Sequence, residues 1–183
     1  MRLFVGVPLL GAARQRAAAV LSRVQPLGWP VRWVREEGLH LTLKFFGEVT
    51  TDRLGSIAEL VTFAADGLRP MAHRLRGLGV FPDVSRPRVI HMEVEAGHDL
   101  ELLQDRLERG GERLGFAPEG RAFRPHVTLG RVREGHRLPD GWESVLDRGA
   151  DGTPFVADRV VLYESQLGPA GPVYEARHTV QLA

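Results

Sequence analysis

Two short strings of the sequence repeat one pattern, and this repeat constrains the fold more than any other feature. The strings are HLTL at residues 40–43 and HVTL at residues 126–129, 86 residues apart. Each lies in a segment whose residue types favour a β-strand, in which residues i and i+2 point to the same face. Each string therefore predicts a strand with an aliphatic face toward the core and a His/Thr face toward solvent, a cleft or a polar partner.

The spacing of the two strings is close to half of the 183 residues, and each string follows a strand–helix–strand pattern. A repeat of this kind predicts two similar halves, each of which delivers one copy of the motif. The length suits one domain, and no long Pro- or Ser-rich linker divides the chain. We therefore expect residues 1–183 to form a single domain.

Hydrophobic periodicity and Gly/Pro punctuation predict the elements along the chain. The expected strands are residues 2–7, 31–34, 39–49, 71–80, 88–95, 123–133, 154–163 and 173–182. The expected helices are residues 9–27, 53–67 and 100–116, the last weakened by Gly110 and Gly111, with a short helix near 142–146 in the loop 134–153 and a turn at 167–172. Helices interleaved with strand pairs favour an α+β fold with antiparallel sheets over a doubly wound parallel sheet.

Composition excludes several kinds of site. There is no cysteine, so disulfides, zinc–thiolate sites, iron–sulfur clusters and a cysteine nucleophile are ruled out. The net charge of +1 does not by itself demand a nucleic-acid partner. Lys44 is the one lysine among 24 basic residues, which reflects either coding bias or a cleft lined by phosphate-binding arginines. No apolar run approaches the roughly 20 residues of a membrane span and the N-terminus is unlike a signal peptide, so we expect a cytoplasmic protein.

Two strands that each present a His and a Thr can place two imidazoles and two hydroxyls around one cavity. One imidazole can take a proton from a nucleophile while the other gives a proton to a leaving oxygen, and the hydroxyls can donate to phosphate oxygens. This set suits cleavage of a phosphate ester without a metal. The sequence has no GxxxxGK[ST] phosphate loop, no paired carboxylates and no histidines at helical metal-ligand spacing.

The strings around the two motifs resemble the 2H phosphoesterases, and within them the RNA 2′,3′-cyclic phosphodiesterase branch, also labelled 2′-5′ RNA ligase. They are RLFVGV at residues 2–7, GLHLTLKFFGEV at 38–49, RPRVI at 86–90, FRPHVTLGRVR at 123–133 and LYESQLGPAGPVYE at 162–175. Gly38 stands where the family usually has Asn. The resemblance implies an α+β fold of two pseudo-symmetric lobes, each an antiparallel sheet with helices on its outer face, around a central cleft.

The resemblance also implies hydrolysis of RNA 2′,3′-cyclic phosphate ends to 2′-phosphate ends, without a cofactor or metal. It implies that His40 is the general acid that protonates the ribose 3′-oxygen, that His126 is the general base that activates water, and that Thr42 and Thr128 bind the phosphate. An acid–base pair of this kind predicts a bell-shaped kcat/KM profile with limbs near the ordinary His pKa of about 6.5. We expect a monomer that has no membrane partner.

Three alternatives stay open at this point. The first is reversible 2′-5′ ligation of RNA ends such as tRNA halves, in which a ribose hydroxyl replaces water. The second is hydrolysis of small nucleotide cyclic phosphates. The third is an RNA-binding module without turnover, which two intact His/Thr motifs disfavour.

Four further residues are candidates for contact with the substrate. Arg131 shortly follows the second motif, where the family commonly carries arginine, and is positioned to reach a phosphate or the adjoining nucleotide. Lys44 and Arg124 share the parity of the neighbouring motif residues, although either side chain can instead extend into solvent. Phe45 is expected either to pack in the core or to stack on a base. The other histidines are expected at the surface or behind the reacting groups: His73, His91, His98, His136 and His178.

Overall fold

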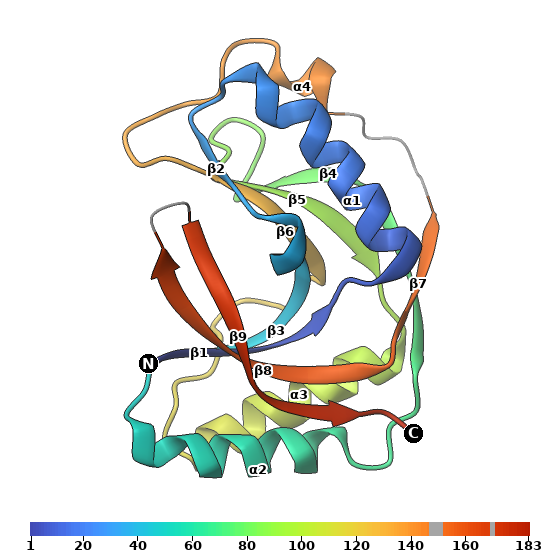
Figure 1. Cartoon of the computed structure of the whole chain (residues 1–183), viewed down its shortest axis with the longest axis vertical. Coiled ribbons are helices and arrows are strands. Elements are labelled where there is room, and N and C mark those ends of the chain that lie inside the picture. The colour runs from blue at the N-terminus through green and yellow to red at the C-terminus, as the bar shows by residue number, and fades with distance from the viewer. Residues whose placement is uncertain (147–151, 169–170) are drawn as a thin grey trace.

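Nine antiparallel strands form one curled sheet in the computed structural model, which describes residues 1–146, 152–168 and 171–183 (Figure 1). The strands are β1 (Arg2–Pro8), β2 (Val31–Trp33), β3 (His40–Glu48), β4 (Met71–Phe81), β5 (Val89–Glu95), β6 (His126–Val132), β7 (Thr153–Ala157), β8 (Arg159–Gly168) and β9 (Gly171–Gln181). The helices are α1 (Gly11–Val24), α2 (Leu54–Ala65), α3 (His98–Arg113) and α4 (Trp142–Val145), with single 3₁₀ turns at Gln25–Leu27, Glu36–Gly38 and Thr51–Arg53. The expected α+β class is confirmed.

The order of strands divides the sheet into two matching halves. It runs β7-β4-β5-β6-β3-β1-β8-β9, with β2 added beside β6, and one residue pair, Leu41 with Val127, joins β3 to β6. We call β3, β1, β8 and β9 the His40 half, and β6, β5, β4, β7 and β2 the His126 half. Each half delivers one motif, as expected, but the halves are not successive in sequence, because the chain passes repeatedly between them.

A single residue connects two strands that lie far apart in the order of the sheet. β7 ends at Ala157 in the His126 half, and β8 begins at Arg159 in the His40 half, so only Asp158 separates them. The strand expected at 154–163 is therefore two strands, each paired in a different half. No Gly or Pro occurs between Phe155 and Tyr163, which is why the sequence pattern showed no break at Asp158.

Helices cover the outer face of the sheet, as expected from the family resemblance. α2 and α3 pack on each other and on the His40 half, whereas α1 packs against β7 of the His126 half (Figure 1). The apolar stripe of α3, Leu100, Leu103 and Leu107, is fully buried against the sheet. None of the helices in the described ranges is long and apolar enough to cross a membrane.

The two glycines of α3 permit close packing and do not end the helix. A Cβ on Gly110 would lie 2.0 Å from Leu60 of α2, and one on Gly111 would lie 2.4 Å from the Lys44 side chain. The helix accordingly continues to Arg113. The cost of glycine in a helix is offset here by contacts that any larger residue would block. The expected short helix is present as α4, while residues 147–151 of the expected loop and 169–170 of the expected turn lie outside the described residues.

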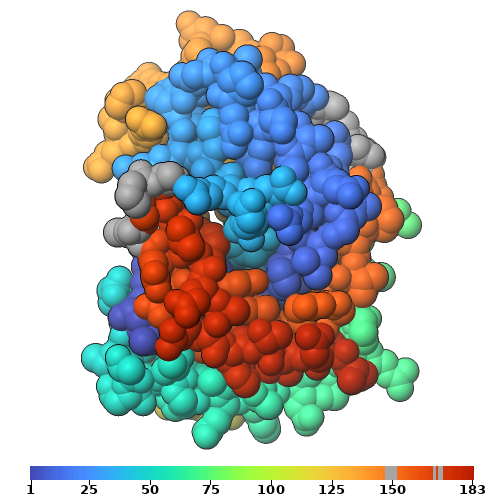
Figure 2. Space-filling view, viewed as in Figure 1, coloured from blue at the N-terminus to red at the C-terminus, as the bar shows by residue number. Residues whose placement is uncertain are grey.

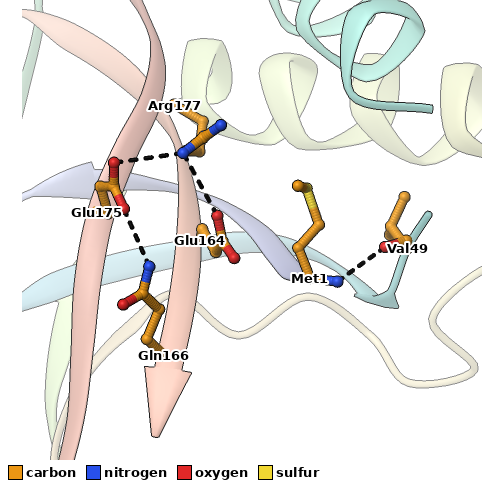
Figure 3. A network of polar contacts seen from close by, with 6 residues as sticks. All are labelled: Met1, Val49, Glu164, Gln166, Glu175 and Arg177. Carbon is orange, nitrogen blue, oxygen red and sulfur yellow. Dashed lines mark hydrogen bonds and ion pairs between the residues drawn. The ribbon is translucent and has the colours of Figure 1, made fainter. Parts of the chain in front are cut away.

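Polar contacts hold the β8–β9 hairpin and the start of β1 (Figure 3). Arg177 of β9 lies 3.6 Å from Glu164 of β8 and 3.3 Å from Glu175, and Glu175 also accepts a hydrogen bond from Gln166 at 3.0 Å. The amino terminus donates to the Val49 carbonyl at 2.9 Å, at the far end of β3. The first and third of these contacts join β8 to β9, and the pairing of β8 with β1 sets the hairpin beside β1.

Candidate active site

The two motifs lie on adjacent strands at the centre of the sheet. Leu41 pairs with Val127, and both are fully buried on the outer face. An antiparallel register around this pair sets His40 beside Thr128 and Thr42 beside His126 on the inner face. The motif strands are thus side by side in one curled sheet. All four His/Thr side chains are half-buried.

The same hydrogen bond fixes the tautomer of both motif histidines. Nδ1–H of His40 donates to the Gly38 carbonyl at 2.7 Å, and Nδ1–H of His126 donates to the Arg124 carbonyl at 2.7 Å. Because a carbonyl only accepts, each neutral imidazole keeps its proton on Nδ1 and leaves a lone pair on Nε2. Thr42 Oγ1 lies 3.0 Å from Nε2 of His40 and donates to it in this state. The arrangement leaves Nε2 unprotonated on both imidazoles, and that of His40 accepts from Thr42.

Burial and neighbouring charges favour the neutral form of both imidazoles. Burial lowers the pKa of His40 to about 4, nearby His126 and Arg131 lower it as well, and the Gly38 carbonyl opposes them. Burial also lowers the pKa of His126, again with Arg131 contributing. The limbs of the kcat/KM profile, which report the free enzyme, are therefore expected below the ordinary value of about 6.5.

Aromatic rings from three strands surround His40. Its ring centroid lies 4.7 Å from that of Phe4, 6.0 Å from Tyr163 and 5.1 Å from Tyr174. Burial raises the pKa of both tyrosines, so they stay neutral phenols. Sequence analysis passed over Phe4 and Tyr174. Strand parity could have found Phe4, because it alternates with the core residues Leu3 and Val5 on β1.

A different group surrounds His126. The ring of Phe81 is stacked 4.0 Å from His91 and stands edge-on 4.9 Å from His126, and the rings of His91 and His126 are 5.2 Å apart. The Arg124 guanidinium carbon lies over the Phe81 ring, 4.8 Å from its centroid. His91 is 2% exposed, and burial lowers its pKa to about 3. His91 thus lies behind His126, whereas His73 is buried beside Phe155 and does not belong at the surface.

A bulge in β3 reverses the alternation of side chains just past the first motif. Consecutive residues of β1 pair with Thr42 and Lys44, which leaves Leu43 as the extra residue. Lys44 is consequently turned to the outer face and is 4% exposed, and its Nζ donates to Glu108 of α3 at 2.6 Å. The prediction that Lys44 binds substrate is wrong for this reason. Phe45 lies on the inner face instead, 51% exposed and 5.7 Å from the ring of Phe4.

An equivalent bulge lies in β6. Consecutive residues of β5 pair with Thr128 and Gly130, so Leu129 is the extra residue. Gly130 takes the outer-face position, where a Cβ would lie 2.6 Å from the ring of Trp33. Arg131 returns to the inner face and is exposed, and its charge lowers the pKa of His40, His126 and Tyr174 alike. The structure therefore brings Arg131 close to both motif histidines.

A hollow of about 260 Å³ opens next to His40. It is lined by Trp33, Val34, Gly38, Pro172, Val173 and Tyr174, among others. Figure 2 shows it where the β8–β9 hairpin, in red, meets the light-blue segment around residues 33–38. Across the described ranges, no three His, Asp or Glu side chains gather in a way that could hold a metal ion.

The curled α+β sheet with two His-x-Thr-x strings on its central strands defines the class of the 2H phosphoesterases. The model of the 2′-5′ RNA ligase superfamily matches residues 16–169, and the chain belongs to this superfamily. A Thermotoga maritima protein named RNA 2′,3′-cyclic phosphodiesterase is 32% identical over 99% of this chain and 95% of its own. A Methanothermobacter thermautotrophicus protein of the same name is 33% identical over 95% of each chain.

Solved structures resemble the fold over its whole length. A Thermus thermophilus protein superposes with a TM-score of 0.84 at 31% identity, over 100% of this chain and 98% of its own. Escherichia coli LigT superposes with a TM-score of 0.75 at 22% identity, over 99% and 96% of the two chains. A further LigT crystal structure contains 3′-AMP. The expected fold of two pseudo-symmetric lobes is thereby confirmed.

Proposed function

We propose that the protein hydrolyses RNA 2′,3′-cyclic phosphate ends to 2′-phosphate ends by two-histidine acid–base catalysis without a metal. The observation that carries the proposal is the matched pair of Nδ1–H bonds, which leave Nε2 of His40 and of His126 unprotonated on the inner face of two adjacent strands. The names of the relatives support the reaction and the RNA substrate.

The roles follow the direction of the two proton transfers. Water attacks the cyclic phosphorus, and its proton goes to Nε2 of His126. The bond from phosphorus to the ribose 3′-oxygen breaks, and that oxygen takes a proton from Nε2 of His40. The product carries a 2′-phosphate and a free 3′-hydroxyl, and the two imidazoles have exchanged protonation states.

The low pKa of His40 makes its protonation depend on the substrate. An anionic phosphate beside the imidazole favours the charged form and raises the pKa, so the acid is generated when substrate binds. Protonated Nε2 then donates to Thr42 Oγ1 or to the leaving oxygen, which frees the Thr42 hydroxyl proton for a phosphate oxygen. Thr128 and Arg131 supply further donors to the phosphate as negative charge develops.

Hydrolysis of a defined RNA tests the proposal. An oligonucleotide ending in 2′,3′-cyclic phosphate is incubated with the protein in excess EDTA, and the product is resolved into 2′- and 3′-phosphate forms. Full activity with a 2′-phosphate product is expected. A predominantly 3′-phosphate product would show that the leaving-group assignment is reversed, and loss of activity restored by a divalent ion would show that the reaction needs a metal.

A further inference from the structure

Three exposed arginines continue the inner face of the His126 half beyond its motif. The bulge at Leu129 returns Arg131 to this face, and Arg133 follows two residues later with the same orientation. Arg32 of β2 pairs directly with Arg131, so their side chains are neighbours on one face. We call Arg131, Arg32 and Arg133 the arginine track.

The track begins at the reacting site and extends away from it. The charge of Arg131 lowers the pKa of both motif histidines, which places this end beside them. Alternate residues of a strand are about 6.6 Å apart, so Arg133 lies one such step further out. An extended polynucleotide with its phosphate at the histidines can therefore meet successive guanidinium groups along the track.

The cross-strand pair of Arg32 and Arg131 is unfavourable without an anion. Like charges directly opposite on neighbouring strands destabilise a sheet. Within the described residues, none of the three arginines of the track forms a hydrogen bond or ion pair with a protein acid. Planar guanidinium forks bind phosphate well, and repeated phosphates can neutralise all three groups.

In the His40 half, β3 carries no arginine past its motif, and Arg2 of β1, whose charge lowers the pKa of Tyr174, stands opposite Glu48 in the register. Past its motif, the inner face carries the ring of Phe45, and the strand ends at Glu48, which is exposed beside the amino terminus. A polyanion that leaves the reacting site is therefore attracted toward β2 and β6 and not along β3. The positive charge beyond the reacting site is thus greater on the His126 half than along β3.

We propose that the RNA strand on the 5′ side of the reacting nucleotide lies along the arginine track, with its phosphates bound by Arg131, Arg32 and Arg133. This inference rests on the proposed function, because that function sets the cyclic phosphate between His40 and His126. It makes oligonucleotide ends better substrates than cyclic mononucleotides, which have no upstream phosphates to reach Arg32 or Arg133.

The first test compares two substrates in the Arg32→Gln/Arg133→Gln variant. For a ten-nucleotide RNA with a cyclic phosphate end, KM is expected to rise about tenfold while kcat holds, the scale of two lost phosphate contacts. For adenosine 2′,3′-cyclic phosphate, kcat/KM is expected to stay unchanged. The control is Arg69→Gln/Arg113→Gln, which removes the same charge from exposed positions in the loop after α2 and at the end of α3. An equal loss on both substrates, or an equal loss in the control, would overturn the track.

The second test measures binding without turnover. The same RNA is titrated against the His40→Ala protein, with and without the two track substitutions, at several salt concentrations. Each phosphate contact on a single strand contributes about 0.7 to the slope of log K against log salt, so the slope is expected to fall by about 1.4. An unchanged slope overturns the track whatever the catalytic result. If the protein with both histidines intact hydrolyses neither substrate, while RNA binding still depends on the track residues, the proposed function is overturned instead.

Discussion

The two halves of the sheet share a backbone around their motifs but surround them with different side chains. In each half the motif histidine donates Nδ1–H to the carbonyl two residues before it, and the fourth motif residue is bulged. Aromatic rings then enclose His40, whereas His91, Phe81 and Arg124 lie around His126. The common backbone keeps the proton of each neutral imidazole on Nδ1, and the differing neighbours affect the pKa and packing of each ring.

One equivalent position shows why the neighbours differ. Gly6 of β1 pairs with Thr42, and His91 of β5 pairs with Thr128. A Cβ on Gly6 would lie 2.8 Å from the Leu41 carbonyl oxygen and 3.2 Å from the His40 ring. The His40 half therefore has no space for a second imidazole at this position, while the His126 half accommodates one.

Loss of either motif histidine is the largest expected effect. His40→Ala and His126→Ala should each lower kcat by more than about 10²-fold, the scale of positioned acid–base catalysis. Both variants should stay folded, because both imidazoles are half-buried on the inner face. Single-turnover assays with circular dichroism as a folding control measure this. Full activity of either folded variant would refute the assignment.

Lys44→Met tests the outer-face position created by the bulge in the His40 half. It leaves the largely buried Glu108 carboxylate without its cation but with hydrogen bonds from Gln104 and the Glu119 backbone N–H, and it should lower the free energy of unfolding by about 2 kcal/mol. Arg109→Met, which removes an exposed pair with Asp105, should cost about 0.5 kcal/mol or less. Denaturant titration measures both. A Lys44→Met protein that is folded but has a raised KM would restore Lys44 to the substrate site.

Arg131→Gln and Phe45→Leu compare the two inner-face positions beyond the bulges. Removal of the Arg131 charge makes both motif histidines easier to protonate, so their pKa values rise. The basic limb of kcat/KM should move to higher pH, and KM should rise about tenfold through the lost phosphate contact. Phe45→Leu should leave the limb in place. The position of the basic limb is measured from pH–rate profiles of the two variants. Identical profiles would contradict the charge effect.

His91→Phe and His73→Phe are expected to give the smallest effects. The pKa of His91 is about 3 in the folded protein and about 6.5 unfolded, so its contribution to stability is complete above pH 6.5 and is lost as pH falls toward 3. His73 also has a lowered pKa. Either substitution should flatten the fall in unfolding free energy over that range, measured by thermal melts across pH. Only His91→Phe should change kcat, by severalfold, because only His91 contacts His126. An equal change in His73→Phe would refute this role.

The sequence predicted correctly which side chains of the two motifs share a face of the sheet. The His-x-Thr alternation needs only the parity of one strand, and this parity holds from His40 to Thr42 and from His126 to Thr128. Most strands and helices were found within a few residues for the same reason: their signals are local. Arg131 was predicted as a substrate contact from the family resemblance. In a regular strand it would point to the face opposite Thr128, and the bulge at Leu129 returns it to the inner face.

The errors arose where a position depends on a partner strand. Lys44 follows simple alternation in the sequence, but the bulge that turns it outward exists only in the register of β3 against β1. His91 could not be matched to His126 before β5 and β6 were known to pair. The break at Asp158 likewise depends on two different partners, β4 and β1. Local patterns carry no information about such registers.

The interleaving of the two halves has a consequence for synthesis of the chain. A growing polypeptide has every strand of the His126 half once Ala157 has emerged, but β8 and β9 of the His40 half are made last. Until then, one edge of β1 has no partner strand, and His40 lacks the rings of Tyr163 and Tyr174 that enclose it. The surroundings of the two motif histidines are thus completed at different times, and a chain that stops short of β9 lacks the ring of Tyr174 beside His40 while it retains His91 and Phe81 beside His126.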